Sequence, residues 1–550
     1  MVSFSPSGSA LHLKYDVGHA KMFAAGTAFL ALVLFVKYVV YQVFFHPLAK
    51  YPGPFLARFT DAHQLWHGWV GDRHLLFHQM HEKYGPVVRY GPNHLSFNTV
   101  TALKKIYGYN SNVAKSEFYN AFVHGAPNIH NTRQKEIHGR KRRIMSNAFS
   151  TASTKTMEPY VHKNIRKLCE LVGPAHDTAA KTEKYSEWST PQNMARWFSY
   201  LTMDVLGDLC YGKSFDLLEK KDNRYSLELL AMATKGHLLC GLMPLAYRWK
   251  LDHIVFRGIA SGRAKFAAYG RERLNERTAL GNSTDRKDFF YYMLNSKEGG
   301  YSFSQPELWG ESTLLLIAGS DTTAASMAAT FFYLVRHPEI LAKATSEVRS
   351  KFTTVEEIGH SSDLSSCLYL RACIDEAMRL SPAVGGLLPR EVINEGITVD
   401  GVFVPPNTIV GVPHYALHHN PDYYPEPFSY VPERWLEGVT NPLTGRVNTS
   451  DDTATVNSGF CPFSIGPRGC IGKGLAYHEM TNTLARLLWL YDIRQAQGVI
   501  DSSGGKPDGV TGRQRESEYQ LIDTFTSITP EGPLVQFRKR RDALEARINL

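Results

Sequence analysis

The sequence predicts a mainly helical protein with small β-sheets, preceded by one N-terminal transmembrane helix. Helical spacing of apolar residues dominates residues 140–380, and short strand-like runs occur near 84–100 and 386–412. Two polar segments, 439–458 and 497–514, are predicted to be loop insertions. Length alone favours two or more domains, because single cores usually stop growing at roughly 250–300 residues.

The N-terminal apolar stretch runs from Met22 to Phe45 and contains a single charge, Lys37. It is long enough for a tilted membrane helix, which needs about 20 residues. Residues 1–21 then form an N-terminal segment, 22–45 the anchor, and 46–58 a proline-rich hinge. A cleaved signal peptide and a buried helix are the alternatives. The stretch is long for a signal peptide, and no small-residue cleavage site follows it.

Composition excludes several classes of protein. The sequence is 43% hydrophobic and 12% aromatic, which can fill a large core. Its seven cysteines are scattered, odd in number and without a CxxC pair, which argues against a disulfide framework or a zinc ribbon. The net charge of +9 suits an acidic protein partner or an anionic membrane surface. No dense basic tract interleaved with aromatic residues indicates nucleic-acid binding.

One long helix is predicted to begin after Ser304 and to end before Pro338. Ser304 and Glu307 have the spacing of a capping box. The polar segment AGSDTT interrupts the apolar pattern in the middle of this helix. It indicates a pocket, lined by Asp321 and Thr322, where the helix could be bent or opened. The alternative is that these two residues face solvent.

Near the C-terminus the sequence reads FCPFSIGPRGCIGKGLAYHEM, which combines a glycine-rich loop with the start of an apolar-periodic helix. Cys470 lies just before that helix. Backbone amides and the positive end of the helix dipole would favour its thiolate form, which is a metal ligand. Taken alone, a single cysteine is more often an inert buried residue. Cys461 lies outside the register of the glycines and is expected to pack in the core.

The surrounding pattern resembles a known family. Phe463, Gly466, Arg468, Cys470 and Gly472 match every fixed position of FxxGxRxCxG, the haem-binding signature of cytochromes P-450. EAMR, PERW and AGSDTT resemble three further segments of that family, in the family's order, and HGRKR and LPREV resemble two weaker ones. Together they cover residues of about 50–540. The sequence is most similar in character to fungal microsomal members of secondary metabolism.

The resemblance implies a haem-binding monooxygenase domain over residues 59–550, which replaces the two-domain expectation from length. Cys470 is expected to be the axial ligand of the iron in haem b (iron protoporphyrin IX), held in a loop with Phe463 and Gly466. The haem propionates are expected to contact Arg142, Arg390, Arg468 and His138, and the family most often has tryptophan at the position of His138. Asp321 and Thr322 are the expected catalytic pair that delivers protons. Glu376, Arg379 and Arg434 are expected to form a buried structural triad.

The implied activity is oxidation of a lipophilic small molecule, expected to be a secondary metabolite, by O2. Electrons would come from a membrane-bound NADPH-dependent flavoprotein reductase, with cytochrome b5 as a second donor. The expected location is the endoplasmic reticulum membrane, single-pass, with the catalytic domain on the cytosolic face. Two sequons, 282–284 and 448–450, are then expected to remain unglycosylated.

Two surfaces are expected from the same resemblance. The substrate pocket should be lined by 113–130, 314–318, 384–388 and 525–529. A basic patch of Lys135, Arg140, Lys141, Arg143 and Lys473 would dock the reductase, unless it is only a solvated face. Two other functions stay open: a non-catalytic haem sensor, and an O2-independent thiolate-haem isomerase or dehydratase. The Asp321–Thr322 pair argues against both, since neither needs a proton relay.

Overall fold

The computed structural model describes residues 17–123, 125–174, 188–251, 254, 256–359, 361–528 and 531–540. Over these residues helices predominate and the strands form four small sheets, which confirms the predicted fold class. Of the predicted N-terminal segment, residues 1–16 lie outside the described residues.

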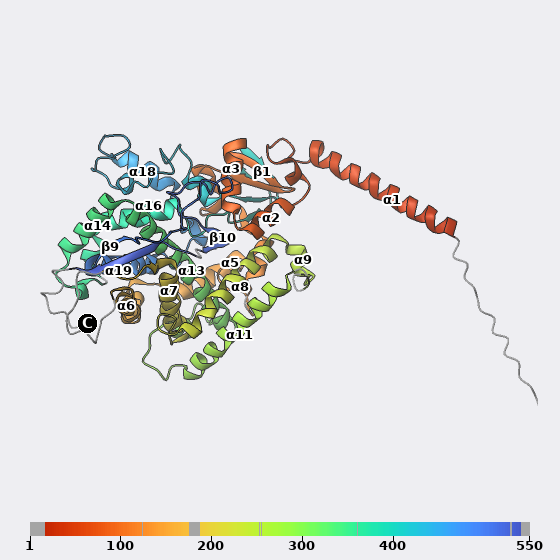
Figure 1. Ribbon diagram of the computed structural model, residues 1–550. Coiled ribbons are helices and arrows are strands. Elements are labelled where there is room, and N and C mark those ends of the chain that lie inside the picture. The colour runs from red at the N-terminus through yellow and green to blue at the C-terminus, as the bar shows by residue number, and fades with distance from the viewer. Residues whose placement is uncertain are drawn as a thin grey trace, which may run out of the picture.

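Helices make up most of the body (Figure 1). Those of the N-terminal half are α1 (Val17–Val40), α2 (Ala62–Val70), α3 (Arg73–Tyr84), α4 (Val100–Tyr107), α5 (Lys135–Ala148), α6 (Thr151–Val172), α7 (Met194–Tyr211), α8 (Tyr225–Leu242), α9 (Pro244–Arg248) and α11 (Arg257–Leu280). Those that follow are α12 (Phe289–Asn295), α13 (Gln305–Arg336), α14 (Pro338–Lys351), α15 (Ser362–Ser365), α16 (Leu368–Leu380), α17 (His414–His418), α18 (Ser450–Gly459) and α19 (Lys473–Leu490).

Helix α1 projects away from the rest of the molecule (Figure 1) and continues as a π-helix over Tyr41–Phe45. The window within Lys21–Phe45 has a mean hydropathy of 2.1, and none of it is buried against the protein. This exposure excludes the buried-helix alternative. The other helix of comparable length and hydropathy, α13, is 78% buried and belongs to the core.

The base of α1 is fastened to the first strand, β1 (Val87–Gly91). The Arg89 guanidinium donates to the backbone oxygen of Gln42 at 3.1 Å and to its side-chain oxygen at 2.6 Å. The Arg89 amide donates to the Pro52 oxygen at 2.7 Å. A Cβ atom at Gly53 would lie 2.0 Å from the Arg89 oxygen, so only glycine permits this approach. Arg89 therefore holds Gln42, just before the predicted hinge, and Pro52 within it.

The largest sheet has five strands in the order β1-β2-β8-β5-β3. Its remaining members are β2 (His94–Phe97), β3 (Val113–Lys115), β5 (Arg390–Val392) and β8 (Ile409–Gly411). β2 and β8 are parallel and the other pairs are antiparallel. In this register Lys115 lies directly opposite Arg390. The two strand-like regions that sequence separates by about 300 residues thus form one sheet.

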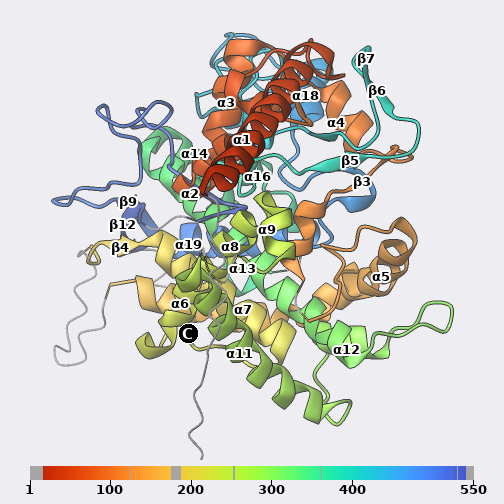
Figure 2. The ribbon, with the colours of Figure 1, turned by 90° about the vertical axis from the view of Figure 1, so that its right-hand side faces the viewer.

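Three smaller sheets complete the fold, and the strands of two of them, β4-β12-β9 and β6-β7, are labelled in Figure 2. They are β4-β12-β9, β6-β7 and β10-β11, with bounds β4 (Gln192–Asn193), β6 (Ile397–Val399), β7 (Val402–Val404), β9 (Tyr491–Gln495), β10 (Ile522–Thr524), β11 (Thr526–Ile528) and β12 (Leu534–Lys539). Single 3₁₀ turns at Phe55–Arg58, Glu117–Phe122, Lys221–Arg224, Val355–Glu357, Pro432–Trp435 and Gly466–Arg468 connect several elements.

Helix α13 lies in the middle of the body in both views and packs against α7, α16 and α19 (Figures 1 and 2). The predicted capping box of Ser304 and Glu307 is present, and the helix ends at Arg336.

The prediction of a loop at 439–458 is wrong in part, because residues 450–459 form α18. Thr449 and Asp452 form a capping box at the start of this helix. The segment is polar and has little apolar periodicity, so the sequence pattern did not indicate a helix.

Candidate active site

A cavity lies between α13 and the loop that precedes α19. The empty space inside it, counted together with the solvent at its mouth, is about 1530 Å³. Helix α13 contributes Ala318, Gly319, Thr322 and Thr323 to the wall, and the loop contributes Phe463, Arg468 and Cys470. The AGSDTT segment therefore borders a cavity, as predicted.

The Cys470 loop is shaped by close backbone contacts. Gly466 has φ +69°, and a Cβ atom there would lie 2.2 Å from the Tyr107 oxygen of α4. The Cys470 amide donates to the Phe463 oxygen at 2.8 Å. Burial raises the pKa of the Cys470 thiol, while the amides of Gly472 and Lys473 and the charge of Arg142 act in the opposite direction. These groups are placed to stabilise a thiolate once a metal binds it.

The other six cysteines are buried away from the cavity wall. Cys461 is 1% exposed, and its sulfur lies 3.6 Å from the His418 Nε2 atom. Burial raises the pKa of its thiol far above the usual range. It therefore belongs to the core, as its register in the sequence predicts.

Four cationic side chains gather at one side of this cavity, of which Lys115 and Arg390 are buried and Arg142 and Arg468 are half-buried. Lys115, Arg142, Arg390 and Arg468 donate hydrogen bonds to neutral oxygens, and none pairs with a carboxylate among the described residues. Burial and then the charges of Arg390 and Arg468 hold the pKa of Lys115 well below its ordinary value. Burial and Arg468 lower the pKa of the neighbouring His138 to about 3.

Uncompensated positive charge is costly to bury, so this cluster fits a ligand that carries carboxylates. The two propionates of haem meet that requirement. The sequence reasoning missed Lys115, which comes from the three-residue strand β3 and reaches the cluster only through pairing with β5. Arg390 itself is buried behind the cavity wall, where it donates to the Tyr119 hydroxyl at 3.0 Å.

The polar residues of α13 have different surroundings. The Thr322 hydroxyl lines the cavity and donates to the Ala318 oxygen at 2.7 Å. The helix is continuous here, so the hypothesis of an opened backbone is wrong in this structure. Asp321 lies behind the wall, 3.5 Å from the hydroxyl of the cavity residue Thr526. Burial raises the pKa of Asp321 to about 7, although the Thr526 hydroxyl works against this rise.

The three predicted structural residues lie together, with Glu376 and Arg379 on α16 and Arg434 in the Pro432–Trp435 turn. Glu376 accepts from Arg379 at 2.8 and 2.9 Å and from Arg434 at 2.9 Å. It also accepts from the Val431 amide and from the Trp435 indole, both at 3.0 Å. Burial alone would raise the pKa of Glu376, but the charges of Arg379 and Arg434 lower it below its ordinary value. The triad thus ties α16 to the Pro432–Trp435 turn.

Only some of the residues predicted to line the substrate pocket border this cavity. The wall includes Leu314, Leu315, Val384, Leu388 and Phe525 from the predicted segments. Residue 529 and residue 124 of those segments lie outside the described residues. Most of this wall is apolar, which suits a lipophilic ligand.

The predicted basic patch needs one correction. Lys141 is 1% exposed and forms ion pairs with Glu307 at 2.8 Å and Glu311 at 3.3 Å. It holds α5 against α13 and cannot dock a partner. Helical periodicity does not distinguish it from its neighbour Arg143, which is exposed. Arg140 is half-buried against the Tyr301 ring, and Lys135 and Lys473 are exposed.

A family model described as Cytochrome P450 matches residues 52–519. The chain belongs to the cytochrome P450 family. It is 40% identical over 93% of its length to the Penicillium oxalicum "Cytochrome P450 monooxygenase poxM", of which 94% is covered. The Emericella nidulans "Cytochrome P450 monooxygenase atnE" is 37% identical, over 95% of this chain and 98% of the relative.

A third relative carries a more specific name. The "Trichothecene C-15 hydroxylase" of Fusarium sporotrichioides is 34% identical over 86% of this chain, with 92% of that protein covered. Membership makes this chain a haem-iron oxidoreductase that incorporates oxygen from O2 with electrons from a redox partner. The cationic side chains and the Cys470 loop described above fit that cofactor.

Proposed function

We propose that this P450 inserts one atom of O2 into a lipophilic small molecule, and that the substrate is a fungal secondary metabolite. The observation that carries this proposal is a single cavity bordered by Cys470, by Thr322 of α13 and by apolar side chains. The relative that hydroxylates a trichothecene gives independent support for the substrate class.

The proposed cofactor is haem b, with Cys470 as the axial ligand of the iron. A thiolate ligand donates electron density to haem iron and favours O–O cleavage over storage of O2. Arg142, Arg468 and His138 would hold the propionates from the cavity wall, with Arg390 behind them. Lys115 joins this set because it borders the same cavity and pairs across the sheet with Arg390. Phe463 and Gly466 would hold the loop beneath the cofactor.

Asp321 and Thr322 are the proposed proton carriers. Thr322 borders the cavity, and its hydroxyl can accept or donate a proton there. A carboxyl group with a pKa of about 7 can release and recover a proton near neutral pH, which suits Asp321 for resupply. The hydroxyl of Thr526 lies between Asp321 and the cavity and can pass that proton on. Leu314 and Leu388 help to exclude other water from the site.

The proposed electron donor is a membrane-bound NADPH-dependent flavoprotein reductase, with cytochrome b5 as a second donor. Exposed Lys135, Arg143 and Lys473 offer a basic surface for an acidic partner, although Arg143 also pairs with Glu298 at 2.5 Å. Lys473 directly follows the Cys470 loop, so a partner docked there would lie near the metal ligand.

We propose an anchor at 22–45, a hinge at 46–58 and a catalytic domain at 59–550 on the cytosolic face of the endoplasmic reticulum. Exposed apolar side chains of α2 and α9 support a membrane-facing side, because both helices lie on the side of the body from which α1 projects (Figures 1 and 2). Among them are Trp66, Trp69 and Leu245, and the exposed Trp249 directly follows α9. Indole rings favour the membrane interface.

The first test is the carbon monoxide difference spectrum of the reduced full-length protein. The wild type and the control Cys461→Ala should give the band of a thiolate-bound haem, and Cys470→Ala should lose it. NADPH turnover under ¹⁸O₂, with the reductase and a panel of lipophilic metabolites, should then give singly labelled product. A Cys470→Ala protein that keeps the band, or product without label, would contradict the proposal.

A further inference from the structure

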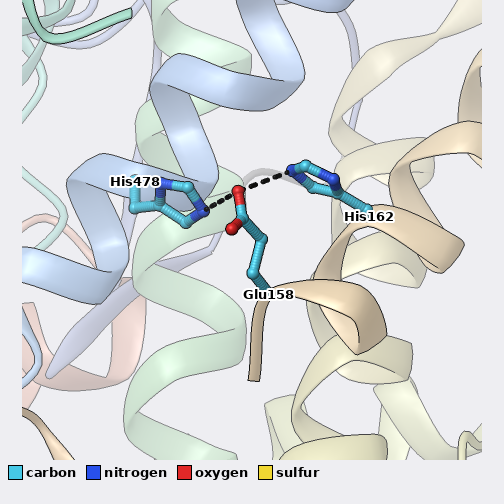
Figure 3. A group of neighbouring side chains, drawn as sticks. All are labelled: Glu158, His162 and His478. Carbon is cyan, nitrogen blue, oxygen red and sulfur yellow. Dashed lines mark ion pairs between the residues drawn. The ribbon is translucent and has the colours of Figure 1, made fainter. Parts of the chain in front are cut away.

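A second group of metal-ligating side chains lies outside the cavity, where α6 packs against α19 (Figure 3). Glu158 and His162 come from α6, and His478 comes from α19. The Glu158 carboxylate lies between the two imidazoles, with Oε1 3.2 Å from His162 Nε2 and 3.8 Å from His478 Nε2. The three ligand atoms all lie within 4.8 Å of one another.

The helices fix this arrangement. Glu158 and His162 are four residues apart, so they share one face of α6. One turn after His478, the Asn482 amide donates to His162 Nε2 at 2.6 Å. Arg486 holds the other end of that amide at 3.0 Å. The ligands are therefore positioned by two packed helices, and not by a flexible loop.

The spacing matches a zinc ion. Bonds of about 2.0–2.2 Å in a tetrahedral site place neighbouring ligand atoms roughly 3.3–3.6 Å apart. The separations from Glu158 to the two histidines, 3.2 and 3.8 Å, lie close to this range on either side, and the ligand atoms of the two histidines lie within 4.8 Å of one another. Two imidazoles and one carboxylate are a donor set that zinc accepts, whereas calcium and magnesium prefer oxygen ligands alone.

An ion can also reach the group. The side chains of Glu158, His162 and His478 are 15%, 14% and 10% exposed, so each keeps some contact with solvent. The hydrogen bond from Asn482 uses the lone pair of His162 that a metal would take. An ion must therefore displace that amide, which selects for a metal with high affinity for imidazole.

We propose that Glu158, His162 and His478 form a zinc site that joins α6 to α19. A water molecule completes the coordination. Because α19 begins three residues after Cys470, the metal would brace the helix that supports the haem loop. The site is separate from the monooxygenase cavity, and the inference does not depend on the proposed substrate, reductase or location.

The test uses tag-free, full-length holoenzyme in detergent, stripped of loosely bound metal with a chelator. Zinc alone is titrated in competition with a chromophoric zinc indicator, and bound zinc per iron is measured by mass spectrometry after dialysis. The expected result is one zinc per haem for the wild type. His162→Gln and His478→Gln should each weaken binding at least tenfold, and Glu158→Gln should weaken it by less.

A matched control is His67→Gln. His67 pairs with a carboxylate, Asp72, at 2.7 Å, but no group of three ligands includes it among the described residues. It should retain wild-type zinc binding. An unchanged haem content and carbon monoxide band in each variant would show that it is folded. Wild-type protein without stoichiometric zinc, or His162→Gln and His478→Gln variants that bind zinc as tightly as wild type, would overturn the proposal.

Discussion

Replacing Glu376 by glutamine tests the buried triad most directly. The Glu376 carboxylate is fully buried and accepts hydrogen bonds from two arginines, a backbone amide and an indole. Glutamine has nearly the same shape but no charge, and one of its two terminal atoms is a donor. Arg379 and Arg434, which are 0% and 2% exposed, would then remain as buried cations without a counter-ion.

The expected loss of unfolding free energy is large. Removing one member of a buried ion pair typically costs about 3–5 kcal/mol, because the remaining charge is uncompensated. Two such charges remain here, but Arg379 also donates to the oxygens of His418 and Pro427 at 2.9 and 2.7 Å, which limits the loss. We therefore expect a destabilisation near the top of that range, a large share of the roughly 5–15 kcal/mol that holds a domain folded.

The assay is urea unfolding of the detergent-solubilised holoenzyme, followed by the carbon monoxide band of thiolate-bound haem and by circular dichroism. Glu531→Gln is the control, because it removes an ion pair with Arg196 in which both side chains are more than half exposed. Such pairs contribute about 0.2–1 kcal/mol. Equal effects of the two substitutions would refute the reasoning.

The pH dependence of the unfolding free energy tests whether Glu376 is charged in the folded protein. The pKa of Glu376 is lowered in the folded protein, so the triad stabilises the fold above the ordinary glutamate pKa of 4.5 and loses this contribution as pH falls below it. The stability gap between wild type and Glu376→Gln should therefore narrow in acid. A gap that widens below pH 4.5 would contradict the assignment of charge.

Three further outcomes are expected. Asp321→Asn should slow product formation by about 10²–10⁴-fold and abolish the decline in wild-type rate as pH rises through about 7, measured as steady-state rate against pH. Because burial raises the pKa of Asp321 from 3.8 to about 7, the wild type should also lose unfolding free energy relative to this variant across that interval. Lys115→Met should release haem to apomyoglobin at least about tenfold faster than wild type, since a charge-assisted bond contributes about 1.5–3 kcal/mol, while the exposed control Lys135→Met should not. Asn282 should stay unglycosylated in a eukaryotic host, and a mass shift that a glycosidase removes would place the catalytic domain in the lumen. Asn448 cannot serve as a second test site, because it is buried and donates a hydrogen bond to the Glu433 oxygen at 2.7 Å.

Features set by neighbours in sequence could be predicted well. The capping box of α13 and the proline that follows this helix depend on contacts within a few residues. The same is true of the Glu376–Arg379 pair, whose members are one helical turn apart. Each local pattern carries its own physical reason, so one sequence suffices to find it.

Features set by distant pairing could not be predicted. Lys115 enters the cation cluster only because β3 pairs with β5, about 275 residues later. Lys141 and Arg143 look alike in sequence, but only Lys141 faces two glutamates of α13. The separation of Thr322 from Asp321, one bordering the cavity and the other behind Thr526, depends on β11 near the C-terminus. A single sequence contains no signal for these contacts.

The clasp between Arg89 and Gln42 has a mechanical consequence. Arg89 belongs to β1, and the same five-stranded sheet carries Lys115 and Arg390 at its far edge. A force that tilts the proposed anchor would therefore act on β1, and through the ladder of backbone hydrogen bonds of this sheet on β3, where Lys115 borders the cofactor cavity. With α1 in a bilayer as proposed, a helix longer than the bilayer thickness would tilt, and that tilt would strain the ladder. The orientation of the proposed anchor would in this way be coupled, through Gln42 and Arg89, to the sheet that carries Lys115.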